Sequence, residues 1–133
     1  MINKSTEAAI AAMSLLAEQY DGGKTALRAA EIAERRCLQK PFVAKLLTRL
    51  SQAGLIRGTP GRHGGYALAK PPKRICLLDI ADCFERKGPL EICPFGPAHC
   101  GNGPKCPLHD DIVRLRDDMC AFLKRTTLDV FRT

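Results

Sequence analysis

The stretch AEIAERRCLQKPFVAKLLTRLSQAGLI, residues 30–56, contains two helical patterns separated by a tight break. The first pattern covers Ala29 to Arg36. The second begins at Pro41, because proline is favoured in the first turn of a helix, and it ends at Gln52. A short helix, a break and a longer helix are typical of a helix-turn-helix. The apolar stripe of the longer helix is predicted to be Phe42, Leu46, Leu47 and Leu50.

The residues on either side extend this pattern to a complete domain. Before it, Ser5 or Thr6 is predicted to cap a first helix. After it, residues 55–57 and 66–68 predict two short strands around a glycine-rich, basic turn. Three helices and such a hairpin make a winged helix-turn-helix, so residues 1–74 are predicted to be a DNA-binding domain. The predicted fold class is therefore mainly α with a small β hairpin.

Positive charge is concentrated in this first part of the chain. The 133 residues carry a formal net charge of +7. Between Arg35 and Arg74 there are ten Lys and Arg residues and no acidic residue. A surface that only meets solvent usually mixes both signs, so the pattern favours a surface that faces phosphates. The predicted partner is a double-stranded DNA operator, and the alternative is a basic winged helix that binds protein instead.

The second helix of the helix-turn-helix and the hairpin tip carry the predicted DNA contacts. A helix in the major groove offers side chains to base edges, while a wing reaches phosphates or the minor groove. The candidates on the helix are Lys40, Lys45, Thr48, Arg49 and Gln52, and those on the wing are Thr59, Arg62 and His63.

Residues 75–133 have a different character. A helix is predicted from Leu77 to Lys87, and residues 93–106 form a loop rich in proline and glycine. Residues 107–126 follow as a long helix whose apolar residues are spaced four and three apart, as in a coiled coil. This helix is predicted to join two copies of the chain into a homodimer. The apolar positions of the seam are Leu108, Ile112, Leu115, Met119 and Phe122.

The loop holds three of the seven cysteines, and a histidine follows it. Cys93, Cys100 and Cys106 offer thiolates, which suit iron–sulfur clusters and zinc alike, but their wide spacing disfavours an ordinary zinc knuckle. His109 is the predicted fourth ligand and His99 competes with it. The other four cysteines are expected to be small buried apolar residues: Cys37, Cys76, Cys83 and Cys120.

These motifs resemble the IscR/NsrR family of winged-helix iron–sulfur regulators over nearly the whole chain. Residues 30–56 resemble the helix-turn-helix, GRHGGYALAK (61–70) the wing, and LLDIADCFE (77–85) the helix before the cluster loop. Ala44 stands where the IscR-type branch carries an acidic base-reading residue, which implies a different preferred DNA site.

The resemblance to the IscR-type branch also implies a cofactor, a 2Fe–2S cluster on the three loop cysteines and His109, in a homodimer joined through the long helix. In the NsrR-type branch an acidic residue near the N-terminus of the partner subunit is a ligand. Glu7 matches that position and is the alternative fourth ligand.

The sequence therefore predicts a DNA-binding transcription regulator whose operator affinity is modulated by an iron–sulfur cluster. Two alternatives have no cluster, namely a zinc-stabilised winged helix and a thiol-switch repressor that uses the loop cysteines. No catalytic triad, phosphate loop or paired-carboxylate site stands out, so an enzyme with a small-molecule substrate is not expected. Because no apolar run reaches membrane-spanning length, the expected location is the cytoplasm.

Overall fold

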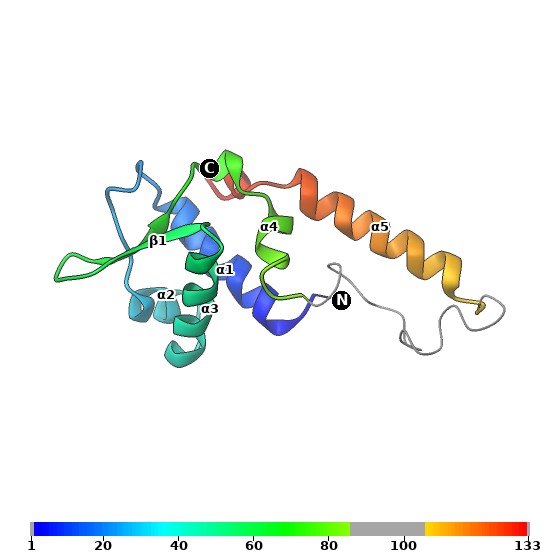
Figure 1. Cartoon of the computed structure of the whole chain (residues 1–133), viewed down its shortest axis with the longest axis horizontal. Helices are drawn as coiled ribbons and strands as arrows, with labels where there is room; N and C mark the ends of the chain where they lie inside the picture. Colours follow the sequence, from blue (N-terminus) through cyan, green and yellow to red (C-terminus); the bar gives the residue numbers. More distant parts are fainter. Residues whose placement is uncertain (1, 86–105, 133) are drawn as a thin grey trace.

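The computed structural model describes residues 2–85 and 106–132, and it confirms a mainly helical fold with one antiparallel hairpin (Figure 1). The elements are α1 (Lys4–Glu18), α2 (Ala29–Arg35), α3 (Lys40–Gln52), β1 (Ile56–Thr59), β2 (Gly65–Leu68), the 3-10 helix η1 (Pro72–Arg74), α4 (Leu77–Ala81), α5 (His109–Arg125) and the 3-10 helix η2 (Leu128–Phe131). No helix among the described residues is long and apolar enough to cross a membrane.

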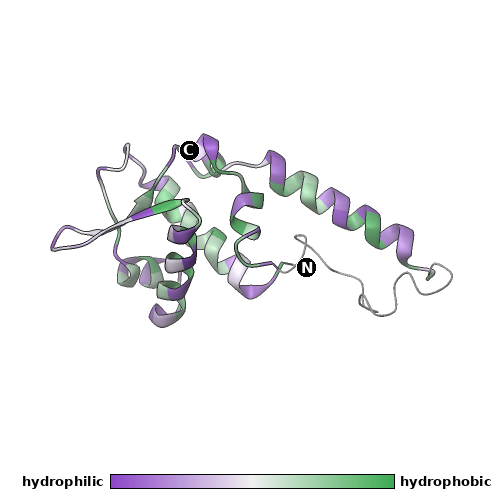
Figure 2. Cartoon of the chain, in the orientation of Figure 1, coloured by the Kyte–Doolittle hydropathy of each residue, from purple (hydrophilic) through white to green (hydrophobic). Residues whose placement is uncertain are grey.

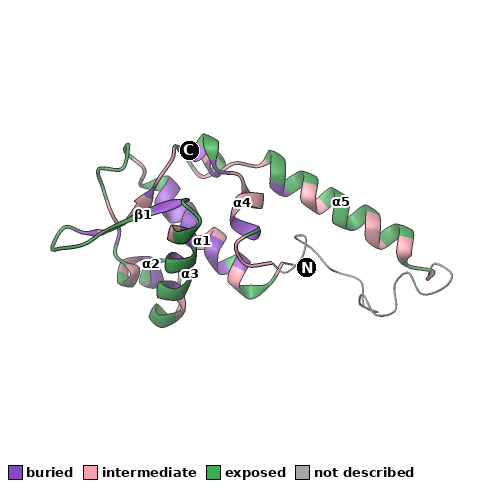
Figure 3. Cartoon of the chain, viewed as in Figure 1, coloured by how far each residue is buried: buried purple, intermediate pink, exposed green. Residues whose placement is uncertain are grey.

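One hydrophobic core joins α1 to most of the other elements. Met13 of α1, Ile32 of α2 and Leu47 of α3 are completely buried in it. Ile80 of α4 and Leu123 near the end of α5 belong to the same buried cluster. In Figure 3 the buried residues accordingly gather where α1, α3 and α4 meet. The division of the chain after residue 74 stays a prediction about organisation, and it does not coincide with a break in this core.

The N-terminus of α1 is capped by a residue that the sequence analysis did not choose. The prediction of Ser5 or Thr6 is wrong, because the side chain of Asn3 accepts a hydrogen bond from the backbone N–H of Thr6 at 2.8 Å. The hydroxyl of Thr6 is buried and donates instead to Glu85 Oε1 at 2.8 Å. A contact 79 residues away in sequence thus decides which polar residue becomes the cap.

The predicted helix α3 is confirmed, with small differences at its start and in its apolar face. It begins at Lys40 with Gln39 as N-cap, and Pro41 lies in its first turn. Phe42, predicted for the core, is only half-buried, while Val43 is completely buried. The buried side chains of α3 are Val43, Leu46, Leu47 and Leu50.

The turn between α2 and α3 contains an exposed cysteine in a left-handed conformation. Cys37 has φ of 55°, and it was expected to be buried but is exposed. The backbone N–H of Leu38 donates to the carbonyl of Ala33 at 2.8 Å, and the N–H of Cys37 donates to that of Glu34 at 3.3 Å. This is a Schellman motif, in which the position of Cys37 normally favours glycine.

A Cys37→Gly substitution is therefore expected to stabilise the protein by about 0.5–1 kcal/mol. Glycine relieves the strain of an L-residue in the left-handed conformation, which stabilises the folded state. Part of this gain is lost because glycine adds conformational entropy to the unfolded chain. Thermal unfolding should show a Tm about 2–4 °C higher. An unchanged or lower Tm would mean that Cys37 makes compensating contacts in the folded state.

The hairpin pairs Ile56 with Leu68 and Thr59 with Gly65, and it is extended by a bridge between Leu27 and Tyr66. Its tip requires glycine. A β carbon on Gly64 would lie 2.0 Å from the Thr59 carbonyl oxygen, and one on Gly65 would lie 2.6 Å from that of Leu27. The two glycines thus allow the wing to fold back closely on itself and on the chain before α2.

The predicted helix from Leu77 to Lys87 is too long, because α4 ends at Ala81. Beyond it the carbonyl of Cys83 accepts a hydrogen bond from Arg49 Nε at 3.1 Å, and that of Phe84 accepts one from Asn3 Nδ2 at 2.9 Å. These two carbonyls are therefore bonded to side chains of other elements.

Helix α5 begins at His109, two residues later than predicted, and its first turns point away from the winged helix (Figure 1). Its last turn returns to the core through Leu123. The chain then pairs with the start of α4, where Leu77 N–H donates to the Thr126 carbonyl and Leu128 N–H donates to that of Ile75, each at 2.9 Å. The winged helix and the long helix are thereby joined at the C-terminal end of α5.

Candidate functional site

Every predicted DNA-contacting side chain is exposed. The positions lie on two elements, α3 and the hairpin, and the hairpin projects from the body as a separate arm (Figure 1). Helix α3 contains no acidic residue. The exposed side chains on α3 are Lys40, Lys45, Thr48, Arg49 and Gln52, and those on the hairpin tip are Thr59, Arg62 and His63.

Two of these side chains have partners within the protein. The hydroxyl of Thr48 donates to the carbonyl of Ala44 at 3.0 Å, which leaves its oxygen able to accept a bond from DNA. Arg49 donates from Nε to the carbonyl of Cys83 at 3.1 Å and is directed toward the residues after α4. Thr48 and Arg49 are consecutive in sequence, but Thr48 bonds within α3 and Arg49 bonds to the segment after α4.

The hairpin tip is held by Arg28, a residue that the sequence analysis missed. Its guanidinium donates a hydrogen bond to the carbonyl of Arg62. Its backbone N–H donates to Glu31 Oε1 at 3.3 Å, so Arg28 is also fixed at the start of α2. No local pattern identifies this role, because the two arginines lie 34 residues apart.

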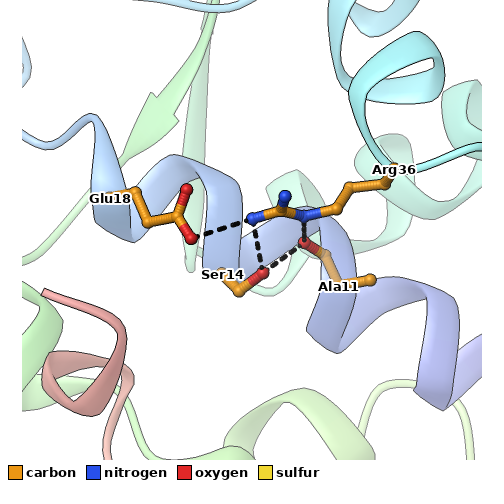
Figure 4. A network of polar contacts seen from close by, with 4 residues as sticks. All are labelled: Ala11, Ser14, Glu18 and Arg36. Atoms are coloured by element: carbon orange, nitrogen blue, oxygen red, sulfur yellow. Dashed lines mark hydrogen bonds and ion pairs between the residues drawn. The ribbon is translucent and has the colours of Figure 1, made fainter.

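Arg36 belongs to the basic stretch, but it is used inside the domain (Figure 4). Its Nε donates to the carbonyl of Ala11 at 3.0 Å, and its Nη2 lies 3.1 Å from both Ser14 Oγ and Glu18 Oε1. These contacts link the end of α2 to the middle of α1. The prediction that the whole acid-free stretch faces phosphates is therefore too broad, because this guanidinium is already engaged.

Of the predicted cluster ligands, Cys106, His109 and Glu7 lie in the described part of the chain, whereas Cys93, Cys100 and the competing His99 lie outside it. Cys106 is half-buried, and His109 is the first residue of α5. The backbone N–H of His109 donates to the carbonyl of Cys106 at 3.1 Å, so a thiol and an imidazole lie within one turn of chain. A thiolate and an imidazole are both ligands that iron–sulfur clusters accept, so this part of the donor set fits.

Glu7 is exposed in the first turn of α1. The start of α5 lies far from α1 within one chain (Figure 1), so the two do not meet there. Among the described residues no group of three or more His, Cys, Asp or Glu side chains is placed to hold a metal ion. Glu7 of a second copy as a ligand stays a prediction.

The surroundings of Cys83 bear on the reactivity of its thiol. Cys83 donates from Sγ to the carbonyl of Asp79 at 3.4 Å, and burial raises the pKa of its thiol above the ordinary value. A thiol with a raised pKa has little thiolate at neutral pH and reacts slowly. Cys76 and Cys120 are half-buried. Cys83 is therefore a poor candidate for a thiol switch.

Helix α5 exposes a row of large apolar side chains. Leu108, Leu115 and Phe122 are seven residues apart and are 46%, 50% and 41% exposed. Ile112 and Met119, which lie between them in the predicted seam, are half-buried. Leu123 is the one buried residue of α5, and apolar and polar residues alternate along the rest of the helix (Figure 2). An apolar row of this size on a water-exposed helix is typical of an interface.

The chain is similar in sequence to known transcription regulators. A family model described as "Rrf2: Iron-dependent Transcriptional regulator" matches residues 2–132. A protein of Aquifex aeolicus named as an HTH-type transcriptional regulator is 32% identical over 100 residues, which are 74% of this chain and 69% of that protein.

Solved structures of two named regulators have the same fold. CymR, titled the global cysteine regulator of B. subtilis, superimposes with a TM-score of 0.77 at 25% identity and covers 97% of this chain and 93% of its own. IscR of T. potens superimposes with a TM-score of 0.75 at 25% identity, covering 96% and 82%. The match extends over the winged helix and the long helix alike.

Proposed function

The chain belongs to the Rrf2 family of DNA-binding transcription regulators, not to a family of enzymes, and from this premise we propose that it is a homodimer whose operator affinity depends on an iron–sulfur cluster. The observation that carries this proposal is that Cys106 and His109, both half-buried, lie within one turn of chain at the start of the long helix. Because operator DNA is its partner, its place of action is the cytoplasm.

For the DNA interface, we propose that α3 enters the major groove and that the hairpin tip contacts the adjacent backbone or minor groove. The exposed cationic and hydroxyl side chains of α3 support this role, as does the anchoring of the Arg62 carbonyl by Arg28. An ordered wing loses less conformational entropy when it binds. The proposed contacts are Lys40, Lys45, Thr48, Thr59, Arg62 and His63.

An Arg62→Ala substitution tests the wing. If the guanidinium contacts a phosphate, the plot of log affinity for operator against log salt concentration should become shallower by about 0.9 of a unit. The measurement is an operator titration at several salt concentrations. The hydrogen bond from Arg28 uses the Arg62 carbonyl, so the substitution leaves the fold of the tip intact. An unchanged slope and affinity would remove Arg62 from the interface.

For the cofactor site, we propose Cys93, Cys100, Cys106 and His109 as the ligands, with Glu7 of a second copy as the alternative to His109. When bound, a cluster supplies iron whose oxidation or loss reports on the state of the cell. Cys106 and His109 would hold it at the first turn of α5, where the helix dipole favours negative charge. An imidazole in place of a thiolate would raise the reduction potential of the cluster above that of an all-cysteine site, as two imidazoles do in Rieske centres.

For the dimer, we propose that the seam of α5 packs against a second copy. Leu108, Leu115 and Phe122 are too exposed for a monomer of this size to leave uncovered without cost. A dimer also presents two α3 helices, one to each half-site of an operator. We propose that a change at the start of α5 alters the fit of both helices to the operator.

Anaerobic purification followed by a visible spectrum and by iron, sulfide and zinc analysis tests the cofactor. The proposal expects absorbance near 400 nm, together with equal amounts of iron and acid-labile sulfide. Stoichiometric zinc without colour would establish the zinc-stabilised alternative. Protein without metal even after anaerobic reconstitution would overturn the cluster proposal.

The second candidate is the thiol switch, and it is favoured by the fold match to the oxidized form of CymR from Staphylococcus aureus, at a TM-score of 0.73 and 27% identity. Such a switch would use Cys93, Cys100 or Cys106 and would release DNA on treatment with peroxide. Cys83 is not proposed as part of it, because burial raises the pKa of its thiol. Reversible release of DNA by peroxide from metal-free protein would distinguish this candidate from the first.

A further inference from the structure

Three segments that are distant in sequence meet in one polar joint, which consists of Asn3, Thr6, Arg49 and residues 83–85. On one side Arg49 Nε donates to the carbonyl of Cys83 at 3.1 Å. On the other side Asn3 Nδ2 donates to the carbonyl of Phe84 at 2.9 Å. The carboxylate of Glu85 accepts bonds from the Asn3 N–H at 3.1 Å and from the Thr6 hydroxyl at 2.8 Å. The joint thus connects the start of α1 and the last turns of α3 to the end of the α4 segment.

The electrostatic surroundings direct Arg49 toward α4. An open pocket of about 400 Å³ lies between α3 and α4, and Asp79 and Asp82 line it together with Arg49. Two carboxylates in the same pocket favour a guanidinium there. The positive charge of Arg49 also acts on Cys83, where it opposes the effect of burial on the pKa of the thiol. Arg49 is exposed like Lys40 and Lys45 earlier on the same helix, but its Nε is bonded to the Cys83 carbonyl.

The joint also lies between α3 and the segment that carries two of the loop cysteines. Residues 83–85 immediately precede, in sequence, the segment that carries Cys93 and Cys100. Any displacement of Cys83 moves the acceptor of Arg49, and Arg49 is part of the helix that is proposed to enter the major groove. The contact is a single directed hydrogen bond from a charged donor, a type of bond that is sensitive to geometry.

We propose that Arg49 is a positioning residue that sets the orientation of α3 through the Cys83 carbonyl, and that it is not a DNA contact. Through this bond the end of the α4 segment controls the fit of α3 to the operator. The part of the inference that links this control to the cluster rests on the proposed function. The part that concerns Arg49 and Cys83 does not.

The first test uses the full chain in its cluster-free form, with Arg49→Ala and Arg49→Lys variants. We expect both variants to bind operator more weakly by the same factor at every salt concentration, so that the salt slope is unchanged. A lysine keeps the charge but cannot donate from an Nε at the same place, so it should not rescue. Arg62→Ala provides the comparison, since its slope should fall by about 0.9 of a unit.

Amide hydrogen exchange provides an independent readout in the same samples. The amides of Cys83, Phe84 and Glu85 are bonded to the last carbonyls of α4. Their exchange should accelerate in both Arg49 variants and stay unchanged in Arg114→Ala. That control removes an arginine of α5 whose guanidinium lies 3.7 Å from Asp111, in a pair with side chains 72% and 71% exposed. A reduced salt slope, a rescue by lysine or unchanged exchange at residues 83–85 would each overturn the assignment of Arg49.

The second test compares operator affinity with and without the cluster. In Arg49→Ala the ratio of the two affinities should approach one while the visible spectrum is retained, and Arg114→Ala should keep the native ratio. A native ratio in Arg49→Ala would overturn the link to the cluster. If the native protein holds no cluster, the proposed function fails, but the salt-slope and exchange results still decide the role of Arg49.

Discussion

Replacing Cys106 with alanine is expected to give colourless protein without bound iron or acid-labile sulfide. The substitution removes one of four proposed ligands, and a half-buried position at the edge of the loop offers no other thiol within the same turn. Loss of a thiolate ligand typically destroys cluster binding, so the expected loss is essentially complete. The measurement is the visible spectrum with iron and sulfide analysis after anaerobic purification.

Cys37→Gly is the matched control for this result, because it removes an exposed cysteine from the turn between α2 and α3. The control should keep its iron and its colour. Operator affinity in Cys106→Ala should then equal that of native protein from which the cluster has been removed. Full iron content in Cys106→Ala would contradict the proposed ligand set.

Introducing a charge into the seam, in the variant Leu115→Glu, is expected to yield monomers. Leu115 is 50% exposed in one chain and lies in the middle of the apolar row of α5. Two ionised carboxylates would be buried close together at a symmetric interface, which costs several kcal/mol. Operator affinity should fall by about 100-fold or more, because a monomer loses the advantage of binding two linked half-sites.

Ala121→Glu is the control on the same helix, because it adds the same charge at an exposed position outside the seam. It should remain dimeric and bind operator as the native protein does. The mass in solution and the operator affinity are measured for both variants. A Leu115→Glu variant that stays dimeric would show that two copies associate through a different surface.

The parts of the fold that depend on local sequence were predictable. The helix-turn-helix could be found because apolar residues recur at helical spacing and because Pro41 and Gly54 mark its limits. The hairpin could be found because a glycine-rich turn separates two apolar strands, and Gly64 is indeed required by a close approach to Thr59. These signals are strong because each depends on residues only a few positions apart.

The errors arose where distant residues compete for the same polar group. Asn3 and Thr6 are both good cap residues, and the choice between them is made by Glu85. The residues that follow α4 are likewise bonded to distant side chains, since Arg49 and Asn3 donate to the carbonyls of Cys83 and Phe84. Partners that lie 34, 79 or 81 residues apart leave no trace in a local pattern.

For the candidate DNA interface, the sequence predicted which types of residue are present but not where their side chains point. Counting charges correctly found a basic stretch, but the stretch includes Arg36, which is bound to Glu18, and Arg49, which is bound to the Cys83 carbonyl. Composition records the presence of a guanidinium and not where it points. The same holds for Cys37, for which an apolar neighbourhood predicted burial and a left-handed turn produced exposure.

The most direct test of the central claim is an anaerobic operator titration of one preparation, before and after its cluster is removed by a chelator. The account predicts that the two dissociation constants differ, and that reconstitution with iron and sulfide restores the first value. Equal constants for cluster-loaded and cluster-free protein would contradict the claim that the cluster controls binding, even if the protein proved to contain one.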